Sequence, residues 1–248
     1  MKTLVFASRN TKEILRDILT LLFGIVFPIT LLVLLSVINS SIPPEAGMSL
    51  FEISNLVPGV SVFGLSFISL FTAVLVSKDR CTSFILRLFT SPLKPSEYIL
   101  GYTLPLIPMA IIQTIVCYVA AFAFGLEYTA NIFLAVIVNI PVAVLFISIG
   151  LLCGTVFNDK MVGGICGALL TNLSAWLSGT WFDLELVGGA FEKVANLLPF
   201  IHAVNAGRAA LSGNYSEIMP HLLWVMGYAL VITVIAVILF NKKMKEDK

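Results

Sequence analysis

Residues 78–101, KDRCTSFILRLFTSPLKPSEYILG, form a charged, proline-containing segment between two hydrophobic runs. Each flanking run is long enough to cross a bilayer, because about 20 apolar residues rising ~1.5 Å each span the ~30 Å hydrocarbon core. The composition agrees, with 58% hydrophobic and only 12% charged residues, whereas about a quarter are charged in soluble domains. The chain is therefore predicted to be an all-α integral membrane protein that holds this segment at a membrane surface.

Hydrophobic runs of spanning length are predicted to form six transmembrane helices. They lie at 18–38, 57–77, 99–124, 132–156, 161–180 and 218–240. Of the 15 Lys and Arg residues, all but Lys193 and Arg208 fall in the N-terminal stretch, the 78–98 loop, the 157–160 turn or the C-terminal tail. This bias predicts that both termini and the 78–98 loop are cytoplasmic. The lipid bilayer is the expected environment, and no nucleic-acid partner is expected.

Two segments are expected to lie along the membrane rather than across it. Residues 1–17 place apolar side chains near helical spacing among basic ones, which is typical of an interfacial helix, with a frayed tail as the alternative. Residues 181–215 are too apolar for a free loop and too charged for a full crossing. Two short helices broken near Leu198 and Pro199 would form a re-entrant, extracytoplasmic hairpin. The whole chain, 1–248, is then one transmembrane domain.

Polar side chains within the runs are few. The candidates for lining a translocation path are Thr72, Gln113, Asn139 and Asn172. Packing between helices is the competing role for each of them. The central portions of the runs hold no ionisable residue, which argues against ion-coupled transport.

Glycines recur four positions apart in the fourth and fifth runs, at Gly150 and Gly154 and at Gly163 and Gly167. This spacing lets helix backbones approach closely in lipid. A dimer interface is predicted at Gly163, Gly164 and Gly167, and packing within one chain is an equal alternative for either pair.

The motifs of a nucleotide site and of an intramembrane enzyme are missing. No G-x-x-x-x-G-K-[ST] sequence occurs, so the chain has no P-loop and any use of ATP requires another polypeptide. There is also no H-E-x-x-H sequence, and His202 and His221 are predicted to be interfacial polar residues. We predict no catalytic residue, bound cofactor or metal site in this chain.

The 78–101 segment resembles the cytoplasmic loop of type 2 ATP-binding-cassette (ABC) exporter permeases. The resemblance is carried by Lys78-Asp79-Arg80, Thr82, Phe84, Arg87-Leu88, Thr90-Ser91-Pro92-Leu93 and Glu97-Tyr98-Ile99-Leu100-Gly101. A second stretch is similar to the signature that follows the fifth span in that family. It comprises Leu177–Phe182, Leu184-Glu185, Ala195–Pro199, His202-Ala203-Val204 and Arg208.

The resemblance implies a permease that dimerises, with itself or with a related chain, and docks separate cytoplasmic ATPases, which bind ATP and Mg. Residues 79–90 would form the coupling helix, which the ATPase moves when it closes on ATP. The residues implied in this coupling are Lys78, Asp79, Arg80, Phe84, Ile85, Arg87, Leu88 and Phe89. The basic side chains could pair with carboxylates of the partner, and the apolar ones could anchor in its groove.

The resemblance further implies export across the cytoplasmic membrane of a prokaryote. The expected cargo is a hydrophobic or amphiphilic compound such as an antibiotic, a peptide or a lipid-like molecule, as in drug resistance. Three alternatives stay open: a polysaccharide or teichoic-acid exporter of the same family, a proton-coupled carrier and an intramembrane hydrolase.

Overall fold

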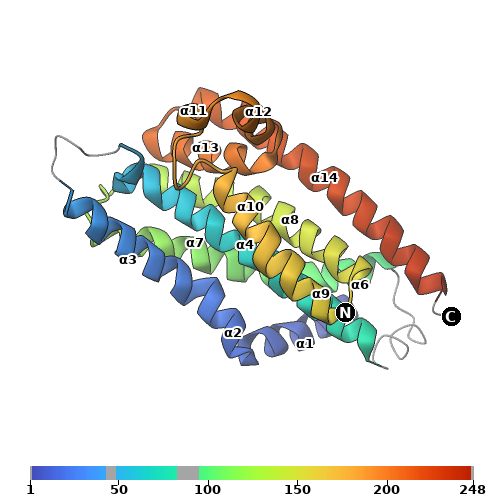
Figure 1. Ribbon diagram of the computed structural model, residues 1–248. Helices are drawn as coiled ribbons and strands as arrows, with labels where there is room; N and C mark the ends of the chain where they lie inside the picture. The colour runs from blue at the N-terminus through green and yellow to red at the C-terminus, as the bar shows by residue number, and fades with distance from the viewer. Residues whose placement is uncertain (1, 43–48, 83–94, 247–248) are drawn as a thin grey trace.

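In the computed structural model, which describes residues 2–42, 49–82 and 95–246, helix α4 (Ile53–Cys81) lies in the middle of a helical bundle (Figure 1). Its 29 residues make it about 43 Å long, more than the ~30 Å of a bilayer core. Serine, glycine and alanine recur along it, so neighbouring helices approach closely on several sides. It packs against α3 (Phe27–Ser40), α7 (Leu106–Phe122), α8 (Asn131–Val156) and α13 (Pro199–Ser212).

All regular structure within the described ranges is helical, which confirms the predicted all-α class. The remaining elements are α1 (Lys2–Arg16), α2 (Ile18–Leu21), the π-helical η1 (Leu22–Val26), the 3-10 turn η3 (Ser49–Phe51), α6 (Pro95–Thr103), α9 (Asp159–Val162), the π-helical η4 (Gly163–Leu170), α10 (Thr171–Trp176), α11 (Leu184–Val187), α12 (Gly189–Leu197) and α14 (Tyr215–Glu246).

Five of the described helical runs are long and apolar enough to cross a membrane. They are Ile18–Ser40, Ile53–Cys81, Ser96–Phe122, Asn131–Val156 and Tyr215–Lys243. They coincide with the first four predicted spans and the sixth. The chain is therefore a multi-pass membrane protein.

The predicted fifth span, 161–180, is divided among three shorter elements. Helix α9, η4 and α10 follow one another from Asp159 to Trp176 and pack along α4 (Figure 1). The π-helical η4 contains Gly163, Gly164 and Gly167, and glycine is a weak helix former. Whether this run crosses the membrane as a sixth span stays a prediction.

One of the two glycine pairs packs inside the chain. Gly150 and Gly154 of α8 face the backbone of α4, where a Cβ added at Gly154 would lie 2.7 Å from the carbonyl oxygen of Ala73. No side chain fits at that distance, so these glycines allow α4 and α8 to touch backbone to backbone. For this pair, packing within one chain is the correct alternative.

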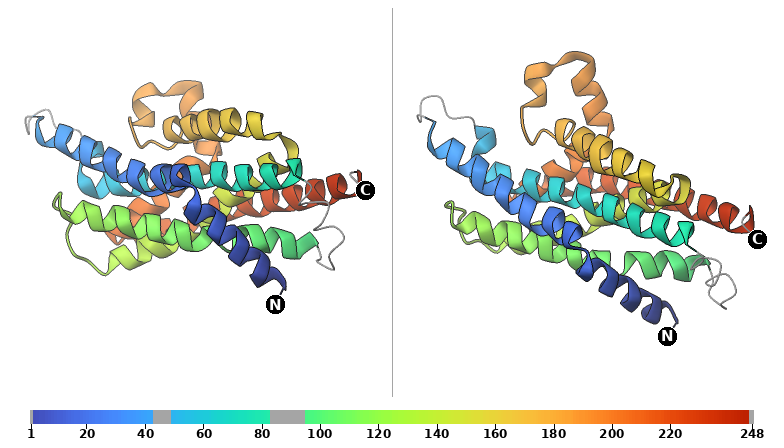
Figure 2. Two further views of the ribbon diagram at one scale, coloured as in Figure 1. Left: turned by 90° about the horizontal axis from the view of Figure 1, so that it is seen from below. Right: turned by 60° about the horizontal axis from the view of Figure 1, so that its bottom comes forward.

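The two termini lie at one end of the bundle, together with the end of α4 and the start of α6 (Figures 1 and 2). An even number of crossings would produce this arrangement. Which side of the membrane this end faces stays a prediction.

The 181–215 segment is helical and broken at the predicted place. Helix α12 ends at Leu197, Leu198 is extended, and Pro199 occupies the first turn of α13, where its missing N–H is tolerated. Helix α13 is largely buried against α4, α8 and α14, so it forms part of the bundle. Insertion of the α12–α13 pair into the outer leaflet stays a prediction.

Arg208 connects α13 to the start of α4 and to the turn after α10. Its Nη2 donates to the carbonyl oxygen of Gly179 at 2.9 Å, and its Nε donates to that of Asn55 at 3.2 Å. Burial lowers the pKa of Arg208 and the nearby Asp183 raises it, but a guanidinium remains charged in proteins. The cation therefore joins α13 to the start of α4 and to the backbone at Gly179.

Candidate functional site

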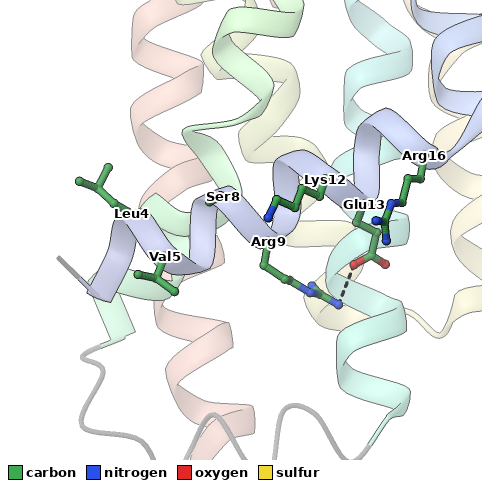
Figure 3. Close-up of a pocket in the computed structure, with 7 residues that line it drawn as sticks. All are labelled: Leu4, Val5, Ser8, Arg9, Lys12, Glu13 and Arg16. Atoms are coloured by element: carbon green, nitrogen blue, oxygen red, sulfur yellow. Dashed lines mark ion pairs between the residues drawn. The ribbon is translucent and has the colours of Figure 1, made fainter.

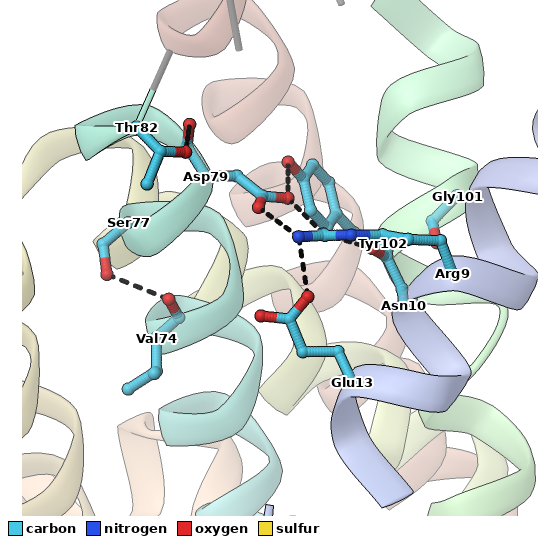
Figure 4. A network of polar contacts seen from close by, with 9 residues as sticks. All are labelled: Arg9, Asn10, Glu13, Val74, Ser77, Asp79, Thr82, Gly101 and Tyr102. Atoms are coloured by element: carbon cyan, nitrogen blue, oxygen red, sulfur yellow. Dashed lines mark hydrogen bonds and ion pairs between the residues drawn. The ribbon is translucent and has the colours of Figure 1, made fainter. Parts of the chain in front are cut away.

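Asp79 is a buried carboxylate in the last turn of α4, only 2% exposed. Both of its oxygens are engaged by Arg9 of α1, with Nη1 to Oδ2 at 2.7 Å and Nη2 to Oδ1 at 2.8 Å (Figure 4). The hydroxyl of Tyr102 on α6 also donates to Oδ2, at 2.9 Å. Such a bidentate, charge-assisted pair is among the stronger polar contacts in proteins. The buried charge is therefore compensated by groups from two other helices.

Arg9 is shared between two carboxylates. Its Nη2 also forms an ion pair with Glu13, one turn later on α1, at 2.6 Å. Because both of these side chains are more than a third exposed, the Glu13 pair adds little stability by itself. Its effect is to hold the guanidinium in the orientation that faces Asp79 (Figure 4).

The inner face of α1 is fixed to α6 by further contacts. The buried Asn10 side chain donates to the carbonyl oxygen of Gly101 at 2.9 Å. Phe6 packs edge-to-face on Tyr102, with ring centroids 5.0 Å apart, and a Cβ at Gly101 would collide with the Phe6 ring. Residues 2–16 are thus helical and packed against α6, so the alternative of a frayed tail is wrong for them. The position of this helix in the membrane interface stays a prediction.

Three elements therefore meet at one point, which we call the Asp79 node and define as Arg9, Glu13, Asp79 and Tyr102. Helix α4 ends at Cys81, and α6 begins at Pro95. The node consequently ties both ends of the 82–94 connection to α1.

Arg80 and Lys78, next to Asp79, have different surroundings. Arg80 donates from Nη1 to the carbonyl oxygen of Gly154 at 2.8 Å and to that of Phe157 at 3.3 Å, so it caps the C-terminal end of α8. Cations are favoured at this end of a helix. Lys78 is exposed.

The predicted coupling residues are therefore placed unequally. The side chains of Asp79 and Arg80 are engaged within the chain, whereas Lys78 is exposed. The part that these three residues play in coupling stays a prediction. The other coupling residues, Phe84, Ile85, Arg87, Leu88 and Phe89, lie outside the described residues, and their roles stay predictions.

The outer face of α1 is open. Leu4 and Val5 are exposed near the start of α1, the basic Lys12 and Arg16 lie farther along the same helix, and all four line an open hollow of about 750 Å³ (Figure 3). Apolar and basic side chains on one helix face suit a membrane surface or a protein partner. Helix α1 thus joins the Asp79 node on its inner side and leaves its outer side for contacts beyond the chain.

Two of the four predicted path residues come together. Gln113 of α7 donates to the carbonyl oxygen of Ser61 at 3.3 Å, and Asn139 of α8 donates to the Ser61 hydroxyl at 3.1 Å. They are 1% and 3% exposed, so in this conformation they join α4, α7 and α8 inside the protein. Their role in a path stays a prediction.

The other two predicted path residues lie apart from this cluster. Thr72 is buried and donates to the carbonyl oxygen of Ile68 on its own helix at 2.6 Å. Asn172 is exposed and donates to that of Ala168 at 2.7 Å. Both hydrogen bonds run four residues back along the same helix, so neither side chain reaches Ser61 or its partners.

The three glycines predicted at the dimer interface also have different surroundings. Gly163 and Gly164 are exposed, and a Cβ added to either would meet nothing within 4 Å. Gly167 faces Leu70 of α4, where an added Cβ would lie 3.2 Å from a Leu70 methyl group. The first two glycines therefore remain available to a second subunit, whereas Gly167 packs within the chain.

Arg9, Glu13 and Tyr102 are the residues of the Asp79 node that sequence reasoning missed. The available signal was Asp79 itself, a single acid flanked by Lys78 and Arg80 at the end of an apolar run. A buried acid at that depth requires a cation, and in the structure this cation is Arg9 of the N-terminal helix.

Comparison with known proteins adds two findings. Residues 1–212 match the sequence profile of the family described as "ABC-2 type transporter". The chain is also similar to ABC transporter G family member 20 of Dictyostelium discoideum, with 27% identity over 184 residues. The matched region covers 71% of this chain and 25% of that relative. The chain thus corresponds to about a quarter of the length of that relative.

Proposed function

This chain belongs to the ABC-2 type transporter family, and we propose that it is the membrane subunit of an ATP-driven exporter whose ATPase is a separate polypeptide. The proposed cargo is a hydrophobic or amphiphilic compound, moved outward across a prokaryotic cytoplasmic membrane. The family assignment argues against a proton-coupled carrier and an intramembrane hydrolase.

The observation that best supports ATP-driven coupling is the Asp79 node. An ATPase that pushed on residues 79–90 would act on a segment whose two flanking helices, α4 and α6, are joined through Asp79 and Tyr102. Arg9 joins the same point to α1. A force on this segment would therefore tilt α1, α4 and α6 together.

The proposed partner surface combines the outward-facing Lys78 with the apolar side chains predicted at Phe84, Ile85, Leu88 and Phe89. Apolar side chains of this kind serve as anchors in protein interfaces. In this proposal the ATPase subunit carries ATP and Mg, and this chain supplies no catalytic group.

The proposed subunit contact lies on η4 and α10. Gly163 and Gly164 are open there, and the neighbouring Leu169, Leu173 and Trp176 are apolar and exposed. Close approach at small residues, flanked by larger apolar ones, is typical of helix pairs in membranes. We propose that a second copy, or a related permease, packs on this face.

A polysaccharide or teichoic-acid exporter is the second candidate, because it would use the same family fold. The two differ in cargo polarity. Transport of a labelled amphiphile and of a labelled glycan by the same purified complex distinguishes them.

Assembly with the ATPase tests the proposal. The ATPase encoded beside this chain should co-purify with it, and the complex should hydrolyse ATP. Phe84→Asp and Leu88→Asp should abolish co-purification. Tyr128→Asp, at an exposed position beside α8 at the other end of the bundle, should leave it unchanged. Retention of the ATPase by both Asp variants at positions 84 and 88 would contradict this docking site.

A further inference from the structure

Two histidines meet where α13 packs against α14. The Nδ1 atom of His202 lies 2.8 Å from the Nδ1 atom of His221, and the two rings have centroids 5.1 Å apart. His202 also stacks on Trp224 of α14, with centroids 5.1 Å apart and planes 6° apart. Both interactions join the start of α13 to the same stretch of α14.

The end of α12 is held at the same place. The Nε2 atom of His202 lies 2.9 Å from the carbonyl oxygen of Asn196, and the hydroxyl of Tyr228 on α14 donates to the carbonyl oxygen of Leu197 at 2.8 Å. The break at Leu198 therefore has its preceding carbonyls satisfied by side chains of α13 and α14. These contacts fasten the α12–α13 pair to the last long helix.

The hydrogen-bond partners of His202 determine which ring nitrogens of the two histidines carry a proton. A carbonyl oxygen only accepts, so Nε2 of His202 carries a proton, and a neutral His202 then presents a lone pair at Nδ1. His221 must donate from its own Nδ1. An added proton can then enter at Nε2 of His221, and the Nδ1 contact survives as a charge-assisted bond. A second proton would put hydrogens on both Nδ1 atoms, and the contact would break.

Few charged groups act on this pair. On α14 the charged group that acts on His221 is Glu217, one turn earlier, and the ring that faces His221 from α13 is His202. On α12 the group facing His202 is the Asn196 carbonyl oxygen, and the charged Glu192 and Lys193 lie one turn earlier in the helix. Arg208 of α13 is engaged with Asn55 and Gly179.

We propose that His202 and His221 form a proton-operated latch that holds α12 and the first turn of α13 on α14, and that α12 is released when both imidazoles are protonated, while the rest of α13 stays in the bundle. The inference does not depend on the cargo or on the ATPase. Since the first proton preserves the contact, the latch stays closed near neutral pH. Because only the second proton breaks the contact, the latch should open in acid, below the ordinary pKa of about 6.5 of a free histidine.

The test measures a distance across the latch in the full-length protein reconstituted in lipid. Spin labels at Leu186→Cys on α11 and Leu230→Cys on α14 use exposed positions, in a Cys81→Ser background because the other three cysteines are buried. The distance distribution is recorded by double electron–electron resonance from pH 7.5 to pH 5. The protein with both histidines should keep one narrow distribution down to about pH 6 and then gain a second, longer one.

Two variants separate the latch from other effects of pH. His221→Asn keeps a donor near the Nδ1 position and cannot become charged, so its distribution should stay narrow at every pH. His221→Ala should show the longer distances already at pH 7.5. A distribution that does not change with pH in the parent protein, or that changes equally in His221→Asn, would overturn the proposal. A closed His221→Ala variant would do so as well.

Discussion

The guanidinium of Arg9 and the carboxylate of Asp79, 70 positions apart in the chain, form two parallel hydrogen bonds of 2.7 and 2.8 Å. The pair connects the N-terminal helix to the end of the central helix, next to the segment proposed to meet the ATPase. Tyr102 adds the third helix to the same carboxylate. Several expected outcomes depend on this arrangement.

Arg9→Ala should destabilise the protein by about 3 kcal/mol, near the lower end for removing one partner of a buried ion pair, because Arg9 is partly exposed. The unpaired Asp79 would remain buried without a cation. Thermal unfolding in detergent measures the loss. Arg16→Ala, an exposed basic residue on the same helix, is the matched control and should leave the unfolding midpoint unchanged.

The double variant Arg9→Met/Asp79→Leu separates stability from coupling. Replacing both partners of a buried pair by apolar residues is often close to neutral for stability. The unfolding midpoint should therefore recover part of the loss, since the buried Tyr102 hydroxyl still loses its acceptor. ATP-driven transport should remain impaired, because α1 is then no longer tied to Asp79. Full transport by this double variant would show that the node has only a structural role.

Arg80→Ala and Lys78→Ala should affect different properties. Loss of Arg80 removes the donor to two carbonyl oxygens at the end of α8, which should lower stability by about 1–3 kcal/mol. Loss of the exposed Lys78 should leave the unfolding midpoint unchanged and weaken binding of the ATPase. Equal effects of the two substitutions on both measurements would contradict these separate roles.

Gly154→Ala should destabilise the chain by about 1–3 kcal/mol, since its Cβ would press on the backbone of α4. Gly227→Ala on α14 has nothing within 4 Å of the new Cβ and should be neutral or slightly stabilising. The unfolding midpoints of the two variants, measured under the same conditions, test this difference in stability. A neutral Gly154→Ala would mean that α4 and α8 are not in backbone contact.

Gly164→Cys, in a Cys81→Ser background, should form a crosslinked dimer on mild oxidation in membranes. The position is open within the chain and lies on the face proposed for the second subunit. Phe133→Cys, an exposed position on α8, should give no such product. Crosslinking at position 133 but not at 164 would place the subunit contact on another face.

Much of the helical framework follows from local patterns in the sequence. The first four hydrophobic runs and the sixth became helices of spanning length, since length and apolarity decide this without knowledge of neighbours. The break at Leu198 follows from Pro199, which restricts the residue before it. The buried face of α1, with Phe6, Asn10 and Ile14, did not follow from hydrophobicity, because Leu4 and Leu15 of the same helix are exposed.

The neighbours of each face could not be predicted in the same way. A glycine repeat shows that two helices can approach closely, but it does not say which helices, and Gly154 proved to face α4 while Gly164 faces outward. The Arg9–Asp79 pair depends on the path of α1 across α6, which no local pattern encodes. The same applies to the four predicted path residues. Only Gln113 and Asn139 contact Ser61, and no local pattern distinguished them from the other two.

The central claim is that this chain exports its cargo with energy from a separate ATPase, and transport by the purified complex tests it most directly. The permease and its ATPase would be reconstituted in proteoliposomes, with movement of a fluorescent amphiphile followed after ATP and Mg are added. The account predicts transport that requires ATP and the ATPase and is lost with Phe84→Asp. Transport by this chain alone, driven by a proton gradient without ATP, would contradict it.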